Sequence, residues 1–195
     1  MLDDIGTGDF YVGMVINCDP MPFSNQTLIT KANGTGNSNW QILIQGDGAG
    51  DDEVGVQLQH IQTSPTISAT TLFTTSETLF VDKTTFIELV KTGDTLKVFS
   101  NGTLIETASA QSKDFDADGD MKISQGNGSN PFDGVLCEFI CKKGAMPDKT
   151  RQIIEAQMAV KWNLNSARAT SKSGRASGFN SLPVSNKFRN RPPRF

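Results

Sequence analysis

Residues 86–107, FIELVKTGDTLKVFSNGTLIET, constrain the fold more than any other part of this chain. They contain three short runs rich in Ile, Val, Phe, Leu and Thr, which suit a pleated, half-buried surface. Residues 92–94, Thr-Gly-Asp, separate the first two runs, and Asn101 and Gly102 separate the last two. Asn-Gly is a strong hairpin signal because both central residues of a type I′ turn need positive φ. The segment therefore predicts an antiparallel meander.

Other short apolar or alternating runs predict more strands, and the 18 glycines are typical of an all-β chain with many turns. One helix is expected at residues 148–162, with Asp148 as its N-cap and Asn163 at its end. Its apolar stripe is expected to include Ile153, Ile154, Gln157, Met158, Val160 and Lys161. The strands are expected at residues 9–16, 26–31, 40–45, 54–60, 70–74, 121–124 and 132–141.

Charge is distributed unevenly along the chain. Residues 1–164 hold 11 Lys and Arg against 21 Asp and Glu, whereas residues 165–195 hold seven Lys and Arg and no acid. The tail is also rich in Ser, Asn and Pro and carries only isolated apolar residues, so it cannot bury a core of its own. We therefore predict a domain at 1–164 followed by a basic extended arm at 165–195.

The cysteines and the first residues suggest folding in a cytosol. Cys137 and Cys141 are four residues apart on an expected strand, about 13 Å, which is too far for a disulfide. With Cys18 they read as buried, reduced thiols. The opening MLDDIGTGDF lacks the basic and apolar regions of a secretory signal, and no run is long and apolar enough for a membrane span.

The order of these pieces resembles the concanavalin A-like lectin/glucanase superfamily, specifically the laminin G-like jelly rolls of phage and bacterial proteins. FDGVLCE at 132–138 resembles the family's F-x-G-x-[IL]-x-E strand, and KWNL at 161–164 resembles its KW-x-L helix end. The resemblance covers residues 9–164. It implies an all-β fold: a two-sheet antiparallel jelly-roll β-sandwich with one short C-terminal helix and an extended tail. The sequence departs from the family in lacking the leading strand that such domains often have. The edge of the sheet could therefore be completed by a neighbouring molecule or by the chain's own tail.

An acidic turn is the candidate metal site. Asp114, Asp116 and Asp118 alternate and precede Gly119, as in the first half of a calcium-binding DxDxDG loop. Gln125 stands where such a loop needs its bidentate Glu, so an exposed acidic turn is the alternative. The sequence predicts no other cofactor.

The resemblance implies two functions to examine, sugar binding and glycan hydrolysis. Related sandwiches bind sugars on loops or on the concave sheet, using aromatic platforms. Trp40 and Trp162 are expected to be buried, so no glycan site is assigned. The glucanase branch has a motif similar to E-x-D-x-x-E, which is absent here, and Glu88, Glu106 and Glu138 stand alone on their strands. We expect no enzyme.

The arm is the expected partner-binding segment. Its cations could meet nucleic acid, but the acidic body offers a complementary surface on a neighbouring copy or subunit, which we favour. An unbound, solubilising tail is the third alternative. The candidate contact residues are the seven cations and three of the Phe residues: Arg168, Lys172, Arg175, Phe179, Lys187, Phe188, Arg189, Arg191, Arg194 and Phe195.

Together these features predict a non-enzymatic virion structural protein, made in the host cytoplasm: a bacteriophage capsid decoration protein anchored by the arm. Its partners would be capsid or tail subunits and copies of itself, with no nucleic acid and no membrane. The alternative from another class is a carbohydrate- or receptor-binding module of a phage tail or a cell surface.

Overall fold

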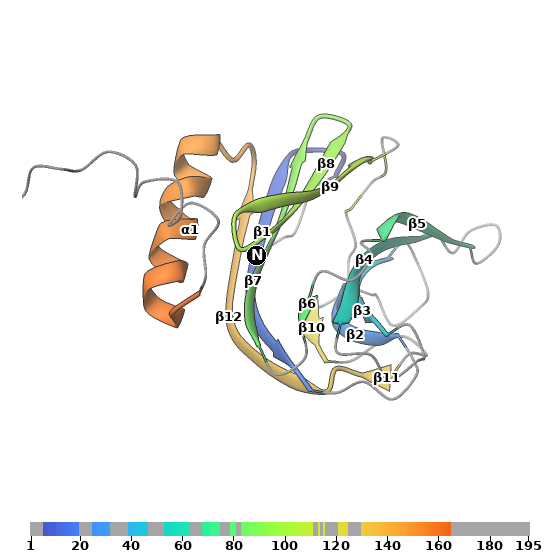
Figure 1. The fold of residues 1–195 in the computed structure, drawn as a ribbon. Helices are drawn as coiled ribbons and strands as arrows, with labels where there is room; N and C mark the ends of the chain where they lie inside the picture. Colours follow the sequence, from blue (N-terminus) through green and yellow to red (C-terminus); the bar gives the residue numbers. More distant parts are fainter. Residues whose placement is uncertain are drawn as a thin grey trace, which may run out of the picture.

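The computed structural model describes residues 6–19, 25–31, 39–46, 53–62, 68–74, 79–80, 83–110, 113, 115, 121–124 and 130–164. These residues form two β-sheets that face each other and one helix, α1 (Asp148–Trp162), on the outside of the first sheet. The predicted all-β sandwich with one short C-terminal helix is confirmed (Figure 1).

The first sheet is entirely antiparallel and has the order β12-β1-β7-β8-β9. It contains the predicted meander, which forms its last three strands. Asn101 and Gly102 both have positive φ, 47° and 81°, as the predicted turn requires. The strands are β1 (Phe10–Cys18), β7 (Thr84–Thr92), β8 (Thr95–Ser100), β9 (Thr103–Ser109) and β12 (Gly134–Lys143).

The second sheet has the order β10-β2-β3-β4-β5, and all neighbours on this path are antiparallel. Two short strands that the sequence did not predict attach to it: β11 pairs with β2 in parallel, and β6 pairs with β4. The strands are β2 (Gln26–Lys31), β3 (Asn39–Gln45), β4 (Glu53–Gln62), β5 (Ser68–Thr74), β6 (Leu79–Phe80), β10 (Met121–Ile123) and β11 (Asn130–Pro131).

The main core lies between the two sheets. Alternate residues of both sheets meet there, as the period of two in a strand requires. Trp40 is buried in this core, as predicted. Phe115 also enters it and packs edge-on against Phe10, with ring centroids 5.1 Å apart. Cys18 is buried beside these residues, and burial raises the pKa of its thiol to about 12, so that the thiol stays protonated.

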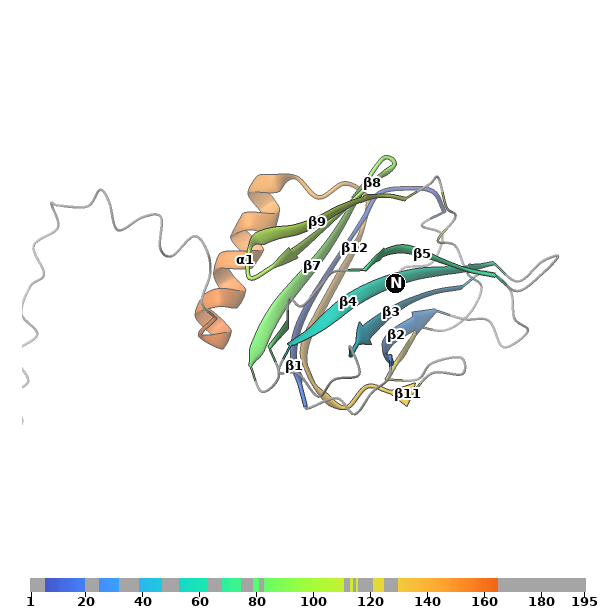
Figure 2. The ribbon, with the colours of Figure 1, turned by 45° about the vertical axis from the view of Figure 1, so that its right-hand side comes forward.

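A second layer of packing holds α1 on the outer face of the first sheet (Figure 1, Figure 2). Met158 and Ile154 of α1 pack against Val15 and Phe86. Strands β1 and β7 are therefore covered on both sides, which explains their almost continuous burial.

The helix has the predicted bounds, but its N-cap residue differs from the predicted one. Asn163 is in the left-handed conformation and Leu164 donates its backbone N–H to the carbonyl of Ala159, which closes a Schellman motif. Asp148 was expected to be the N-cap, but Pro147 holds that position and no side chain caps the first turn. Asp148 is instead the first residue of the helix, where its negative charge interacts favourably with the positive end of the helix dipole.

Candidate functional site

The outward face of the second sheet is mostly polar. In β3, Trp40, Ile42 and Ile44 point into the core. Gln41, Leu43 and Gln45 therefore point to the opposite side, and Leu43 is the apolar residue among them. In β4, Val56 and Leu58 point inward, which places Gln57 and Gln59 on the same outward side. We call the outward side of β10, β2, β3, β4 and β5 the polar face.

Strand register aligns five polar residues into one row across this face. Lys122 of β10 pairs with Thr30 of β2, and Thr30 pairs with Gln41 of β3. Gln41 pairs with Gln59 of β4, which in turn pairs with Thr71 of β5. Direct cross-strand partners on one face lie about 5 Å apart, so the row crosses the whole sheet.

Glutamine amides link the middle of the row. Gln41 Nε2 donates to Gln59 Oε1 at 2.8 Å, and Gln59 Nε2 donates to Gln57 Oε1 at 2.6 Å. Because each amide donates in the same direction, this series of hydrogen bonds leaves Gln41 Oε1, at its end, without a donor among the described residues. The hydrogen bonds fix the side chains in place before any ligand arrives.

The middle of the polar face is buried and its edges are exposed. Thr30 is 2% exposed, and Gln41 and Gln57 are each 7% exposed. Lys122 and Thr71, at the two ends of the row, are exposed. Polar groups this deeply buried normally have hydrogen-bond partners.

Three oxygens of the polar face break that rule. Thr30 Oγ1, Gln41 Oε1 and Gln45 Oε1 are buried and have no hydrogen-bond partner in the part of the chain that the structure describes. A buried polar group without a partner costs about 1–3 kcal/mol. All three atoms accept hydrogen bonds, so they suit a ligand that presents hydroxyl donors.

A second polar cluster lies between α1 and the first sheet. Arg151 Nη1 is 2.9 Å from Glu88 Oε2 and 3.5 Å from Glu155 Oε2, and Tyr11 Oη donates to Glu88 Oε1 at 3.1 Å. The guanidinium also stacks over the ring of Phe99, 3.8 Å from its centroid. Glu88 is fully buried and paired with Arg151, so the expectation that it stands alone on its strand was wrong.

This cluster fixes the helix rather than forming a site. Burial raises the pKa of Glu88 to about 7, against the opposing effect of the Arg151 guanidinium and the Tyr11 hydroxyl. Burial likewise raises the pKa of Tyr11, and the Glu88 charge adds to that rise. The charged groups of Glu88, Arg151 and Glu155 are paired with each other beneath the helix, so this cluster has a structural role.

Glu138 also has partners on the helix. Its Oε2 accepts hydrogen bonds from Lys161 Nζ and from Trp162 Nε1, both at 2.8 Å. The bonds from Lys161 and Trp162 lower the pKa of this carboxyl group. Trp162 was expected to be buried, but at the end of α1 it is only half-buried, packed at the edge of the contact between helix and sheet.

The predicted site residues fall outside the described part of the chain. This holds for the candidate calcium ligands Asp114, Asp116 and Asp118 and for the whole arm, residues 165–195. Among the described residues, no group of three or more His, Cys, Asp or Glu side chains could hold a metal ion. No helix within them is long and apolar enough to cross a membrane.

Comparison with known proteins identifies the fold and goes no further. No family model matches this sequence, and no curated protein matches it. The CBM40 of the Ruminococcus gnavus IT-sialidase is similar in structure, with a TM-score of 0.58 and 14% identity, over 77% of this chain and 84% of that one.

Two other solved structures are similar to a comparable degree. Domain 4 of the GH43 arabinanase AbnA from Geobacillus stearothermophilus has a TM-score of 0.56 and 16% identity, over 76% of this chain and 66% of that one. A SAP-like pentraxin from Limulus polyphemus has a TM-score of 0.51 and 15% identity, over 82% of this chain and 72% of that one. These likenesses support the two-sheet β-sandwich fold that was predicted from the sequence.

The polar face was missed at the sequence level, although a signal was present. WQILIQ and VGVQLQH place Gln at alternate positions opposite the apolar residues. Alternation of this kind is typical of any half-exposed strand, so it does not by itself distinguish a binding surface from solvent-facing polar residues. Burial of these glutamines is the observation that distinguishes the two, and it depends on the tertiary structure.

Proposed function

We propose that this chain is a glycan-binding module and that the polar face is its binding surface. The observation that carries the proposal is the set of buried oxygens without partners: Thr30 Oγ1, Gln41 Oε1 and Gln45 Oε1. Sugar hydroxyls would donate to these acceptors and thereby remove the cost of their burial.

The glutamine chain supports this assignment because it holds the acceptors in fixed positions. A ligand that meets side chains already ordered loses less conformational entropy on the protein side. Trp40 lies inside the core, so hydrogen bonds rather than stacking on that ring would dominate the contact. Lys122 at the edge of the row adds one cation that can meet a hydroxyl or a carboxylate.

The similar structures support the same class of ligand. The Ruminococcus gnavus CBM40 has been solved bound to α2,3-sialyllactose, and AbnA domain 4 in complex with arabinotriose. Those ligands belong to those proteins, which share no more than 16% of their residues with this chain. Their shared fold favours a saccharide over other small molecules as the first ligand class to test.

A glycan array with the full chain tests the proposal. We expect selective binding by the wild type and at least a tenfold loss of affinity in Thr30→Val and Gln41→Leu. The matched controls are Thr103→Val, at an exposed position of β9, and Gln152→Leu on α1; both should bind as the wild type does. The proposal fails if the wild type binds no glycan, or if both variants of the polar face keep full affinity.

The virion interpretation stays a prediction. The arm on which it depends lies outside the described residues, and none of the similar structures described above is a capsid protein. The expected absence of catalysis and the virion location are likewise untested.

A further inference from the structure

The helix α1 places its charges and its apolar residues on unexpected sides. Arg151 and Glu155 face the first sheet and are 4% and 2% exposed. Ile153 and Val160 point away from the sheet and are 52% and 86% exposed. An ordinary surface helix has the reverse arrangement, with its apolar stripe on the protein and its charges in water.

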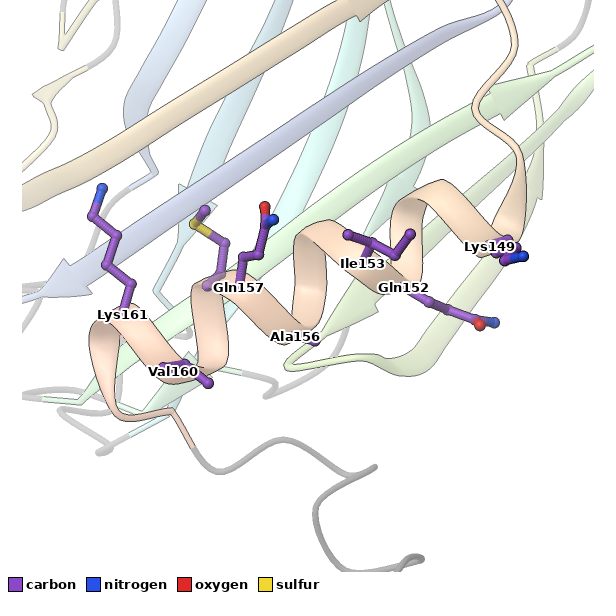
Figure 3. Close-up of a pocket in the computed structure, with 8 residues that line it drawn as sticks. Lys149, Gln152, Ile153, Ala156, Gln157, Val160 and Lys161 are labelled. Atoms are coloured by element: carbon purple, nitrogen blue, oxygen red, sulfur yellow. The ribbon is translucent and has the colours of Figure 1, made fainter.

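The exposed residues form one continuous stripe. Lys149, Ile153, Ala156 and Val160 are spaced by four, three and four residues, so they share one side of the helix. At 100° per residue this side is opposite Arg151 and Met158, which are buried against the sheet. A groove of about 740 Å³ runs along it, lined also by Gln152 and Gln157 (Figure 3). We call it the α1 groove.

The predicted apolar stripe of α1 is thus divided between two contacts. Ile154 and Met158 pack on the sheet, whereas Ile153 and Val160 are exposed in the α1 groove. Exposed apolar residues in a contiguous stripe mark a surface that another segment covers. The question is which segment covers it.

The chain itself supplies a segment at the correct place. After the Schellman motif at Asn163 and Leu164, 31 residues follow, beginning at one end of the α1 groove. A helix of 15 residues is about 22 Å long, which an extended chain covers with about seven residues. The arm is therefore long enough to run back along the whole helix, and it has apolar residues to place there: Phe179, Leu182, Val184, Phe188 and Phe195.

We propose that the arm, residues 165–195, binds the α1 groove of its own chain. Aromatic and aliphatic side chains of the arm would cover Ile153, Ala156 and Val160, and the amides of Gln152 and Gln157 would bond to its peptide groups. Tethering at Leu164 gives the arm an effective concentration in the millimolar range at this groove, which a separate partner rarely reaches.

Charge is compatible with this arrangement but does not drive it. Lys149 and Lys161 flank the groove, and Lys161 is already bonded to Glu138. The described residues that line the groove include no acid, so the proposed contact does not depend on the seven cations of the arm.

Hydrogen exchange of the arm in the full-length chain tests the proposal. We expect amides in residues 165–195 of the wild type to exchange at least tenfold more slowly than in the isolated peptide of that sequence. Val160→Glu and Ile153→Glu should bring the rate to that of the peptide. The matched control is Val135→Glu, which adds the same charge at an exposed valine of β12 and should change nothing.

The remaining outcomes overturn the proposal. They are an arm that exchanges at the peptide rate in the wild type, and slow exchange that survives both groove substitutions. Slow exchange that disappears on hundredfold dilution, with a dimer in sedimentation, would assign the groove to a second copy instead. Because Val160 and Ile153 are exposed, both variants should fold, and exchange within α1 reports whether they do.

Discussion

Thr30 and Gln41 show why single polar residues are the most informative positions of this molecule. Both lose their water on folding, and one oxygen of each gains no partner among the described residues. Such atoms lower stability, so a chain selected for stability alone would replace them with apolar groups of the same shape. Their presence on one face is the physical basis for the proposed ligand site.

Thr30→Val should therefore stabilise the protein while it weakens glycan binding. Valine keeps the shape and the β-branch of threonine and removes the unpaired hydroxyl, so we expect the free energy of unfolding to rise by about 1 kcal/mol. Urea denaturation without ligand measures it, with Thr103→Val as the control near zero. A loss of stability larger than 1 kcal/mol would mean that Thr30 Oγ1 has a structural partner after all.

Glu88 predicts a pH dependence of stability. Burial raises its pKa in the folded protein to about 7, from an ordinary value of 4.5. Between these two values the folded state holds a proton that the unfolded state has released, so stability falls as pH rises from about 4.5 to 7. The largest loss from this one group is roughly 3 kcal/mol, at 1.4 kcal/mol per pKa unit.

Glu88→Gln should remove that part of the slope. The neutral amide can still accept the Tyr11 hydroxyl, and Arg151 keeps Glu155 as its counter-ion. Unfolding free energies at pH 5 and pH 8 measure the difference between the two proteins. Equal slopes in wild type and variant would show that Glu88 does not titrate in this range.

Among the elements, the β8–β9 hairpin and α1 depend on each other. The turn at Gly102 lies against the carboxylate of Glu155, and a Cβ built on Gly102 would overlap it. Gly102 also has φ of +81°, which side chains rarely adopt. The hairpin turn therefore needs glycine for its own geometry and also for the helix beside it.

Gly102→Ala should destabilise the protein more than Gly93→Ala does. Gly93, in the β7–β8 turn, has φ of +54° and nothing within 4 Å of its Cβ position, so that variant reports backbone strain alone, about 1 kcal/mol. At Gly102 we expect a further 1–2 kcal/mol, because Glu155 must leave its place beside Arg151. Thermal unfolding of the two variants gives the comparison, and equal losses would contradict the proposed contact.

At the scale of the whole molecule, the second sheet, the first sheet and α1 form three successive layers, so the two sheets have different surroundings. The first sheet is covered by the second sheet on one side and by α1 on the other. The second sheet meets the first sheet on its inner side, and the polar face is its other side. The proposed ligand site and the α1 groove therefore lie on opposite sides of the sandwich.

The local sequence determined the helix and most of the strands, because turn residues and apolar patterns act within a few positions of the chain. Positive φ at Asn101 and Gly102 set the hairpin, alternation set the strands of the second sheet, and Asn163 set the end of α1. The short strands β6 and β11 were not predicted, because two residues carry no periodic pattern.

The tertiary structure decided which face of each element is covered. An alternating strand has two different faces, but its sequence does not show which one meets another layer. Glu88 looked like an isolated carboxylate because its partner Arg151 lies 63 positions further along the chain. The same holds for Gln41 and Thr30: their burial arises from pairing between strands, so only the folded chain shows which polar atoms are left without a partner.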